Sequence, residues 1–176
     1  MPRKLIILSA SILLTLTSIS AQSKNKLWAG AEVGYGITLS DENITQSNKS
    51  ISTLRALAGY YVAPNLSLGV AVGLSSYIIT NTVPLFLDVR YHPIGSNPNY
   101  VVNWAVGYAL ATSENDVEGK FTTDISLGYK ILDIGKIQFV PAIGYNYNTY
   151  SIDNPLTTSS NNYSQHSLFL KIGLLF

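Results

Sequence analysis

Apolar residues occupy alternate positions along most of the chain after residue 22. The pattern recurs in eight segments, at 27–39, 53–62, 66–75, 83–92, 102–111, 121–131, 137–148 and 167–176. Alternation with a period of two predicts β-strands that have one apolar face. Eight strands of about ten residues or more are long enough to cross a membrane when tilted, since a membrane strand needs roughly 9–11 residues.

The connectors between these segments fall into two sets that alternate along the chain. Residues 63–65, 93–99 and 132–136 contain turn-forming residues, whereas 40–50, 80–82, 113–119 and 151–164 are longer on average and rich in Asn, Ser, Thr and acids. Short turns at one rim and longer loops at the other are typical of outer-membrane barrels. The sequence therefore predicts an all-β fold, an eight-stranded antiparallel up-and-down transmembrane β-barrel. Its first strand begins, and its last strand ends, at the periplasmic rim.

The first 21 residues differ in character from the rest. Arg3 and Lys4 precede an apolar run over 5–19, and the small residues Ser20 and Ala21 follow it. This arrangement predicts a secretory signal peptide at 1–21, with the barrel domain at 22–176. The alternative, a transmembrane helix, needs about 20 apolar residues, and the run is shorter than that. We therefore expect an exported protein.

The composition excludes several classes of protein. Of the 176 residues only 12% are charged, the formal net charge is +1, and there is no cysteine. Soluble domains carry about 25% charged residues, and nucleic-acid binding requires a basic surface patch. We predict no nucleic-acid partner. Neither a phosphate loop nor a dinucleotide motif occurs, so we predict no cofactor, and the metal content stays open.

The low charge also decides which face of the strands meets lipid. The non-apolar face consists mainly of Gly, Ala, Ser and Thr, far below the roughly 25–35% of charged residues on a water-facing surface. A soluble, lipocalin-like barrel is therefore disfavoured, and the apolar face is predicted to contact lipid while the small residues fill a narrow lumen. Aromatic residues gather near strand ends, as in membrane-interface girdles. The predicted girdle residues are Tyr35, Tyr108, Tyr145 and Tyr147 at the outer rim, and Tyr60, Tyr91, Tyr100, Tyr129 and Phe176 at the periplasmic rim.

Three features carry a resemblance to a known group of proteins. They are the final alternating strand that ends in Phe176, the segment 83–91 and five Gly-Tyr pairs. With these features the chain resembles the small outer-membrane β-barrels of the OmpX/OmpA-like group, especially the single-domain barrel proteins common in Bacteroidota. The resemblance implies a bacterial outer-membrane location, contact with outer-membrane lipid and lipopolysaccharide, and recognition of Phe176 by the outer-membrane assembly machinery. It implies no particular activity.

Charged residues on the predicted inner face form the first candidate site. Unpaired charges in a narrow lumen cost several kcal/mol, so we predict a lumenal ion-pair network in which Arg55 and Arg90 each bind a carboxylate. Its predicted members are Glu32, Arg55, Asp88, Arg90, Asp124, Lys130 and Lys171. The network is interpreted either as a structural plug or as a gated path for protons or small ions.

The predicted outer loops hold the second candidate site. Glu114, Asp116 and Glu118 supply oxygen ligands suited to a divalent cation shared with lipopolysaccharide phosphates, although acids in solvated loops need no ligand. An enzyme is not predicted, because His166 and Ser167 are adjacent on a strand and point to opposite faces.

The predicted function is structural or adhesin-like, with the outer loops as interaction surface and a monomeric barrel as anchor. The surface partner is not identified by the sequence. A small pore or a lateral gate for ions or hydrophobic solutes is the alternative, and a lipid-modifying enzyme is a distant one.

Overall fold

A computed structural model describes residues 27–41, 50–76, 81–93, 99–112, 117–134, 137–153 and 160–176. The predicted signal peptide at 1–21 lies outside these residues. The strands are β1 (Leu27–Asp41), β2 (Ser50–Ala63), β3 (Leu66–Ser76), β4 (Asn81–Tyr91), β5 (Tyr100–Ala111), β6 (Val117–Tyr129), β7 (Leu132–Ile134), β8 (Ile137–Asp153) and β9 (Ser160–Leu175). Within the described residues, no helix has the length and apolar character needed to cross a membrane.

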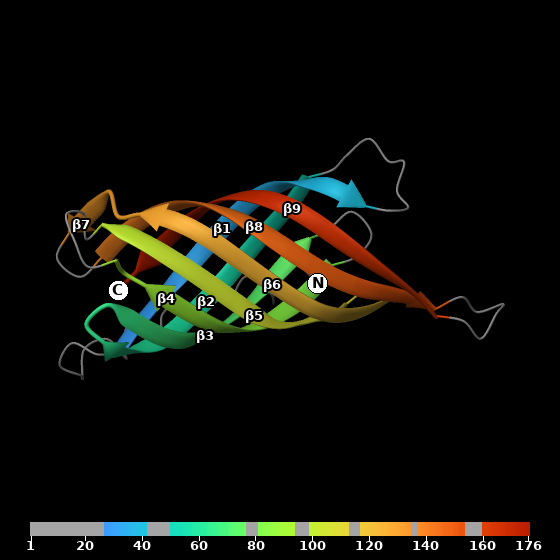
Figure 1. The fold of residues 1–176 in the computed structure, drawn as a ribbon, viewed down its shortest axis with the longest axis horizontal. Helices are drawn as coiled ribbons and strands as arrows, with labels where there is room; N and C mark the ends of the chain where they lie inside the picture. The colour runs from blue at the N-terminus through green and yellow to red at the C-terminus, as the bar shows by residue number, and fades with distance from the viewer. Residues whose placement is uncertain are drawn as a thin grey trace, which may run out of the picture.

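Eight of these strands close into one antiparallel barrel (Figure 1). Neighbours along the chain pair from β1 to β6, β8 pairs with both β6 and β9, and β9 pairs with β1. The three-residue strand β7 pairs only with the start of β8, in the connection between β6 and β8. The predicted eight-stranded barrel is confirmed, with β7 as a small addition at the short-turn rim.

The register shows how strongly the strands tilt. Following paired residues around the barrel from Trp28 leads through Asp88 and Asp124 to Thr38. The path thus returns to β1 displaced from residue 28 to residue 38. In closed barrels, strand number, stagger and tilt are linked, and eight strands leave an interior just wide enough for side chains to fill. The inner face is therefore a packed core.

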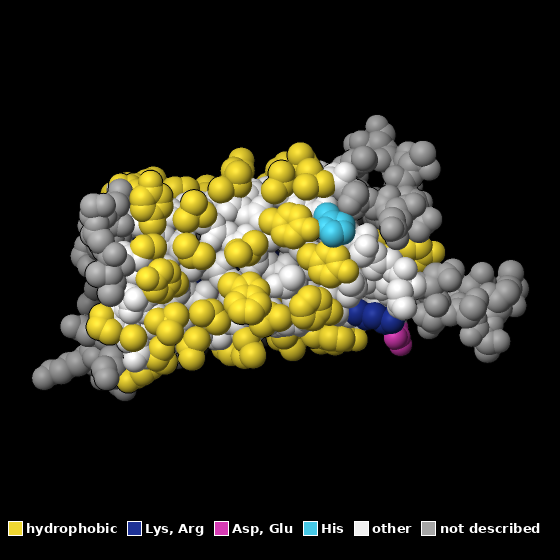
Figure 2. All heavy atoms as spheres, in the orientation of Figure 1, with side chains coloured by type: hydrophobic (Ala, Val, Ile, Leu, Met, Phe, Trp, Pro, Cys, Tyr) yellow, Lys and Arg dark blue, Asp and Glu magenta, His cyan; other side chains and the backbone are white. Residues whose placement is uncertain are grey.

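Burial alternates along each strand as the apolar pattern predicts. In β4, Phe86 and Asp88 are buried, while Leu85 and Leu87 between and beside them are exposed, Leu87 by 64%. Figure 2 shows the result as a band of hydrophobic side chains around the outside of the molecule. Exposed apolar patches on this scale mark a membrane surface. The prediction that the apolar face lies outside is confirmed.

The outer connectors are shorter than the sequence pattern indicated. Residues 151–164 were expected to form a loop, but β8 continues to Asp153 and β9 begins at Ser160. Likewise 117–119 belong to β6 and 81–82 to β4. These segments are polar on both faces, because strands that project beyond the lipid band have water on the outside too. Without an apolar face they gave no alternation to detect.

The two tryptophans lie on opposite sides of the barrel wall. Trp28 is 6% exposed and points into the lumen, whereas Trp104 is 53% exposed on the outer band. The Trp104 indole N–H donates to Thr123 Oγ1 at 3.1 Å, and Thr123 Oγ1 donates to the carbonyl of Ala105 at 3.0 Å. This chain of hydrogen bonds satisfies a polar group that faces hydrocarbon.

The opposite placement of the tryptophans gives a direct test of which face meets lipid. In vesicles that contain lipids brominated on the acyl chains, the fluorescence of Trp28→Phe, which retains Trp104, should be strongly quenched. The fluorescence of Trp104→Phe, which retains Trp28, should be nearly unaffected, because the barrel wall separates Trp28 from the quencher. Equal quenching of both variants would contradict the assignment of the faces.

Candidate functional site: the filled lumen

An apolar plug closes the periplasmic end of the lumen. Trp28 and Val101 stand at the starts of β1 and β5, and Leu175 stands at the end of β9. Together with neighbours from four other strands they form one buried cluster, consisting of Trp28, Leu57, Ala71, Phe86, Val101, Ala105, Val140 and Leu175. Seven of the eight barrel strands contribute to the cluster, so apolar side chains from nearly the whole wall meet inside the barrel.

Two glycines make room for the largest side chain of this plug. A Cβ atom on Gly59 would lie 2.5 Å from Trp28 Cζ2, and one on Gly69 would lie 3.1 Å from the same atom. Gly59 and Gly69 are directly paired across β2 and β3. The indole therefore lies against bare backbone, which explains why these two inward positions carry no side chain.

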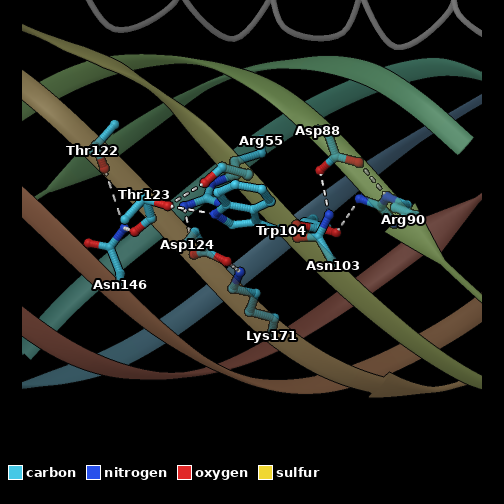
Figure 3. Close-up of polar contacts among 12 residues, drawn as sticks. Arg55, Asp88, Arg90, Asn103, Trp104, Thr122, Thr123, Asp124, Asn146 and Lys171 are labelled. Atoms are coloured by element: carbon cyan, nitrogen blue, oxygen red, sulfur yellow. Dashed lines mark hydrogen bonds and ion pairs between the residues drawn. The ribbon is translucent and has the colours of Figure 1, made fainter.

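A first group of buried charges is centred on Arg90 and lies among the residues of the apolar cluster (Figure 3). Arg90 donates from Nε to Asp88 Oδ1 at 2.8 Å and from Nη2 to Glu32 Oε1 at 2.7 Å. Asn103 donates to the other oxygen of Asp88 at 2.7 Å. The Arg90 guanidinium also lies over the Trp28 ring, 4.7 Å from its centroid. The Arg90 fork thus joins β4 and β1 across the lumen and seats the charges on the plug.

A second group lies beside the first and is centred on Asp124. Its Oδ2 accepts a hydrogen bond from Arg55 Nη2 at 3.2 Å, and its Oδ1 accepts one from Lys171 Nζ. Arg55 lies over the Phe86 ring, with 4.5 Å from Cζ to the centroid. Figure 3 shows Arg55 and Lys171 reaching Asp124 from different strands. One carboxylate therefore holds together β2, β6 and β9.

The two groups balance each other in charge. Arg90 with Asp88 and Glu32 carries one net negative charge, and Asp124 with Arg55 and Lys171 carries one net positive charge. Glu32 and Arg55 are directly paired across β1 and β2, so the groups adjoin. The six charges sum to zero, so each buried ion has an opposite charge nearby whose attraction offsets part of its desolvation cost.

Lys130 does not join these groups, which corrects the prediction that included it. The residue follows the last residue of β6, is half-buried, and donates its backbone N–H to the carbonyl of Asn99 at 2.8 Å. Among the described residues it makes no ion pair. Lys130 lies one residue beyond the end of β6, at the periplasmic rim and apart from the two charge groups.

Uncharged polar residues line the outer half of the lumen, and the sequence did not single them out as site residues. Gln165 donates to Thr38 Oγ1 at 2.8 Å, and Asn146 donates to the carbonyl of Thr123 at 3.0 Å. Ile51 and Phe169 form a small buried apolar pair on the same inner surface. Asn103, Asn146 and Gln165 could have been found from the sequence, because each carries an amide at an inward position of a strand whose other face is apolar.

His92 lies just beyond the end of β4 at the periplasmic rim. Burial, together with the positive charges of Lys130 and Arg90, lowers the pKa of His92 to about 4. Its ring packs against Tyr61, with centroids 6.0 Å apart. Both the apolar contact and the nearby cations favour the neutral imidazole.

This lowered pKa predicts a loss of stability in mild acid. Because the unfolded chain binds a proton near the ordinary pKa of 6.5, the contribution of His92 is full above that pH and is lost as the pH falls toward 4. Urea unfolding in detergent micelles at several pH values should show a smaller acid loss for His92→Gln than for the wild type. An NMR titration of folded protein with a midpoint near pH 6.5 for His92 would overturn the prediction.

The predicted girdle residues lie on the outer face near both ends of the hydrophobic band. Tyr35, Tyr60, Tyr91, Tyr100 and Tyr108 are exposed, while Tyr129, Tyr145, Tyr147 and Phe176 are half-buried. At the periplasmic end Tyr100 and Tyr129 pack edge to face with centroids 5.1 Å apart. This placement is suited to rings that sit at the lipid–water boundaries.

The predicted cation site is only partly within the described residues. Glu114 and Asp116 lie outside them, and Glu118 is exposed in β6. In the part of the chain that is described, His, Asp and Glu residues nowhere gather in threes that could hold a metal ion.

The chain is similar to known proteins in its three-dimensional structure. No protein-family model matches the chain, and no curated protein matches it. The structure is similar to that of the outer membrane protein AlkL, solved by solid-state NMR in DMPC bilayers, with a TM-score of 0.58, 14% identity and coverage of 89% of this chain and 93% of AlkL. It is also similar to Neisserial surface protein A, with a TM-score of 0.52, 12% identity and coverage of 84% and 95%.

The class of protein follows from the sheet and its surface. Only helices and closed barrels satisfy all backbone groups in hydrocarbon, and here a closed antiparallel sheet carries a continuous apolar band on its outside. At one rim the strands β8 and β9 continue well beyond the length that the membrane requires. The chain is a small eight-stranded transmembrane β-barrel of the bacterial outer membrane.

Proposed function

We propose that this barrel is a closed membrane anchor that presents its outer strands and loops as an interaction surface. The observation that carries the proposal is the filled lumen. The inner face carries a buried apolar cluster, two groups of paired charges and, toward the outer rim, buried polar side chains. A conducting barrel needs a continuous hydrated path, so a lumen filled by these side chains favours a function on the outside of the barrel.

The longest strands support a surface role. β8 and β9 have 17 and 16 residues, well beyond the roughly 9–11 that a membrane strand needs. Beyond the band their hairpin continues as a paired ribbon, on which Tyr150 and Tyr163 stack with centroids 5.6 Å apart and planes at 24°. Figure 1 shows this hairpin extending past the other strands. A rigid projecting hairpin is suited to adhesin-like contact with a partner.

Three finer features belong to the same proposal. The barrel acts as a monomer, the C-terminal Phe176 is the residue that the outer-membrane assembly machinery recognises, and lipopolysaccharide surrounds the outer rim.

A divalent cation at the outer rim is a further part of the proposal. Glu118, with Glu114 and Asp116, holds the cation there. Calcium titration of the purified barrel should then raise its melting temperature, and Glu118→Gln should weaken that response.

Conductance measurements distinguish a closed membrane anchor from a pore. Planar bilayers that contain the purified wild-type barrel should show no conductance above the lipid background. The double variant Trp28→Ala and Val140→Ala removes two parts of the plug, and it serves as the positive control that shows the assay can detect an opened lumen. Steady channels from the wild type would refute the proposal.

A lateral gate for hydrophobic solutes is the second candidate, favoured by an interruption in the wall. The β3–β4 ladder has no pair between Val72–Leu85 and Ser75–Thr82, where Pro84 lacks a backbone N–H. Next to it an apolar hollow of about 710 Å³ spans β2 to β5, with Val72, Leu85 and Tyr108 in its lining. If Pro84→Val reduced the transfer of a hydrophobic dye across vesicles that contain the barrel, this candidate would replace the first.

A further inference from the structure

A polar cluster interrupts the outer end of the hydrophobic band. The Tyr145 hydroxyl is hydrogen-bonded to Nδ1 of His166, and the Tyr147 ring lies 5.0 Å from the imidazole, centroid to centroid. His166 lies on the outer face, because Gln165 and Ser167 on either side of it are buried on the inner face. Among the described residues, Nε2 of His166 has no partner. An imidazole with one nitrogen fixed by a tyrosine leaves the other for a ligand.

A lysine stands two strands away at the same end of the band. Lys120 of β6 reaches over β8 and donates from Nζ to Asn162 Oδ1 of β9 at 2.6 Å. Asn162 is four residues from His166 along β9, about 13 Å at roughly 3.3 Å per residue. Lys120 Nζ and the His166 ring are therefore two separate points on this face. Figure 2 shows a histidine and a basic side chain at the outer edge of the yellow band on this face, with an acid beside the base. The acid on this strand is Glu118, two residues farther out and exposed.

An apolar groove runs from this cluster down the wall of the barrel. Its upper part, about 320 Å³, is lined by Ile125 and Leu127 of β6, Ile143 and Tyr145 of β8, and Leu168 of β9. Its lower part, about 470 Å³, shares Leu127 and Ile143 and continues to Tyr100 and Tyr129 at the periplasmic rim. Tyr145 belongs to both features, because its ring lines the groove and its hydroxyl holds His166.

We propose that the outer face of β6, β8 and β9 is a binding site for a phosphorylated glycolipid of the lipid A type. An acyl chain lies in the groove below Tyr145, one headgroup phosphate is bound at His166 Nε2, and a second phosphate of the same headgroup is bound at Lys120 Nζ. The projecting β8–β9 hairpin lies at this rim, opposite the rim at which β1 begins and β9 ends. We take this rim as the outer one, so the site meets the outer leaflet. Two donors beside an apolar channel match an amphiphile that has phosphate at one end and hydrocarbon at the other.

The negative charge of Glu118 affects how tightly the glycolipid phosphate is expected to bind. Its carboxylate lies on the same outer surface as Lys120 and opposes an anion there, unless a divalent cation joins it to the phosphate. Glu118→Gln should therefore tighten binding of the glycolipid when divalent cations are removed with a chelator.

The test measures lipid retention on the full barrel by native mass spectrometry from detergent micelles. Diphosphorylated lipid A is titrated against wild type and against Lys120→Gln with His166→Gln. We expect at least a tenfold loss of affinity in the double variant. The matched control, Lys130→Gln with His92→Gln, changes the same residue types at the opposite rim and should bind as the wild type does. Heat-modifiable migration on a gel verifies that each variant is folded.

Binding measurements with other lipids show which part of the glycolipid the site recognises. Lipid A with its phosphates removed should bind the wild type as weakly as the intact glycolipid binds the double variant. Phosphatidylglycerol should bind at least tenfold more weakly than lipid A, and equal binding would overturn the choice of glycolipid. Ile143→Trp fills the groove and should also lower the affinity. Unchanged affinity in both the Lys120–His166 variant and the groove variant would overturn the site.

Discussion

Replacing Asp124 by alanine is expected to destabilise the folded barrel by about 3–5 kcal/mol, the usual cost of removing one partner from a buried ion pair. The Asp124 side chain is 0% exposed and binds both Arg55 and Lys171, whose side chains are each 3% exposed. Its loss leaves two cations in the lumen without their carboxylate. Urea unfolding of the barrel in micelles or bilayers, followed by tryptophan fluorescence, measures the change.

A charge-neutral replacement in the same group is the control. Asp124→Leu with Lys171→Met removes one charge of each sign at similar volume, so the remaining lumenal charges still sum to zero, and apolar replacement of a buried ion pair is often neutral or stabilising. The double variant should therefore recover most of the stability that Asp124→Ala loses. If Asp124→Ala unfolded at the same urea concentration as the wild type, the ion pairs would not be a structural element of the lumen.

The second large effect is expected for Leu87→Arg on the outer face. Leu87 is 64% exposed near the middle of β4, and an arginine facing lipid at the bilayer midplane costs about 2–4 kcal/mol. The matched control is Leu27→Arg, because Leu27 is also exposed but opens β1 at the periplasmic rim. There the cost falls to about 0–1 kcal/mol.

The comparison of these two arginine variants depends on depth alone. Both start from an exposed leucine, so neither creates a cavity. A soluble barrel would tolerate both equally, since an exposed arginine would then lie in water. Equal unfolding midpoints for the two variants would therefore contradict the membrane assignment.

The fold could be predicted from the sequence because the membrane gives each strand a simple pattern. Lipid on one side and a packed lumen on the other force alternation, and this alone located all eight barrel strands. The pattern ended where the lipid ends. Residues 160–164 of β9 have no apolar face, so their strand structure depends on pairing with β8, which alternation does not report.

The charge groups could be predicted only in part. The alternation along the strands predicted that Glu32, Asp88 and Asp124 face inward. Which cation each carboxylate binds depends on which strands face each other across the lumen, and alternation does not report this. Asp124 binds Arg55, 69 residues away, and that contact exists only in the closed barrel. Lys130 was included because the alternation continues past the end of β6, whereas Tyr129 is the last residue of that strand and Lys130 forms none of the ion pairs.

The spacing of these ion pairs has a consequence for how the barrel reaches its final state. Arg90 and Glu32 are 58 residues apart, and Lys171 and Asp124 are 47 apart. A sheet whose first and last strands have not yet met holds these charges apart and exposes them along its concave side. The ion pairs that join distant strands therefore form only when the sheet curls and closes, so charge pairing in the lumen and closure of the barrel are one event.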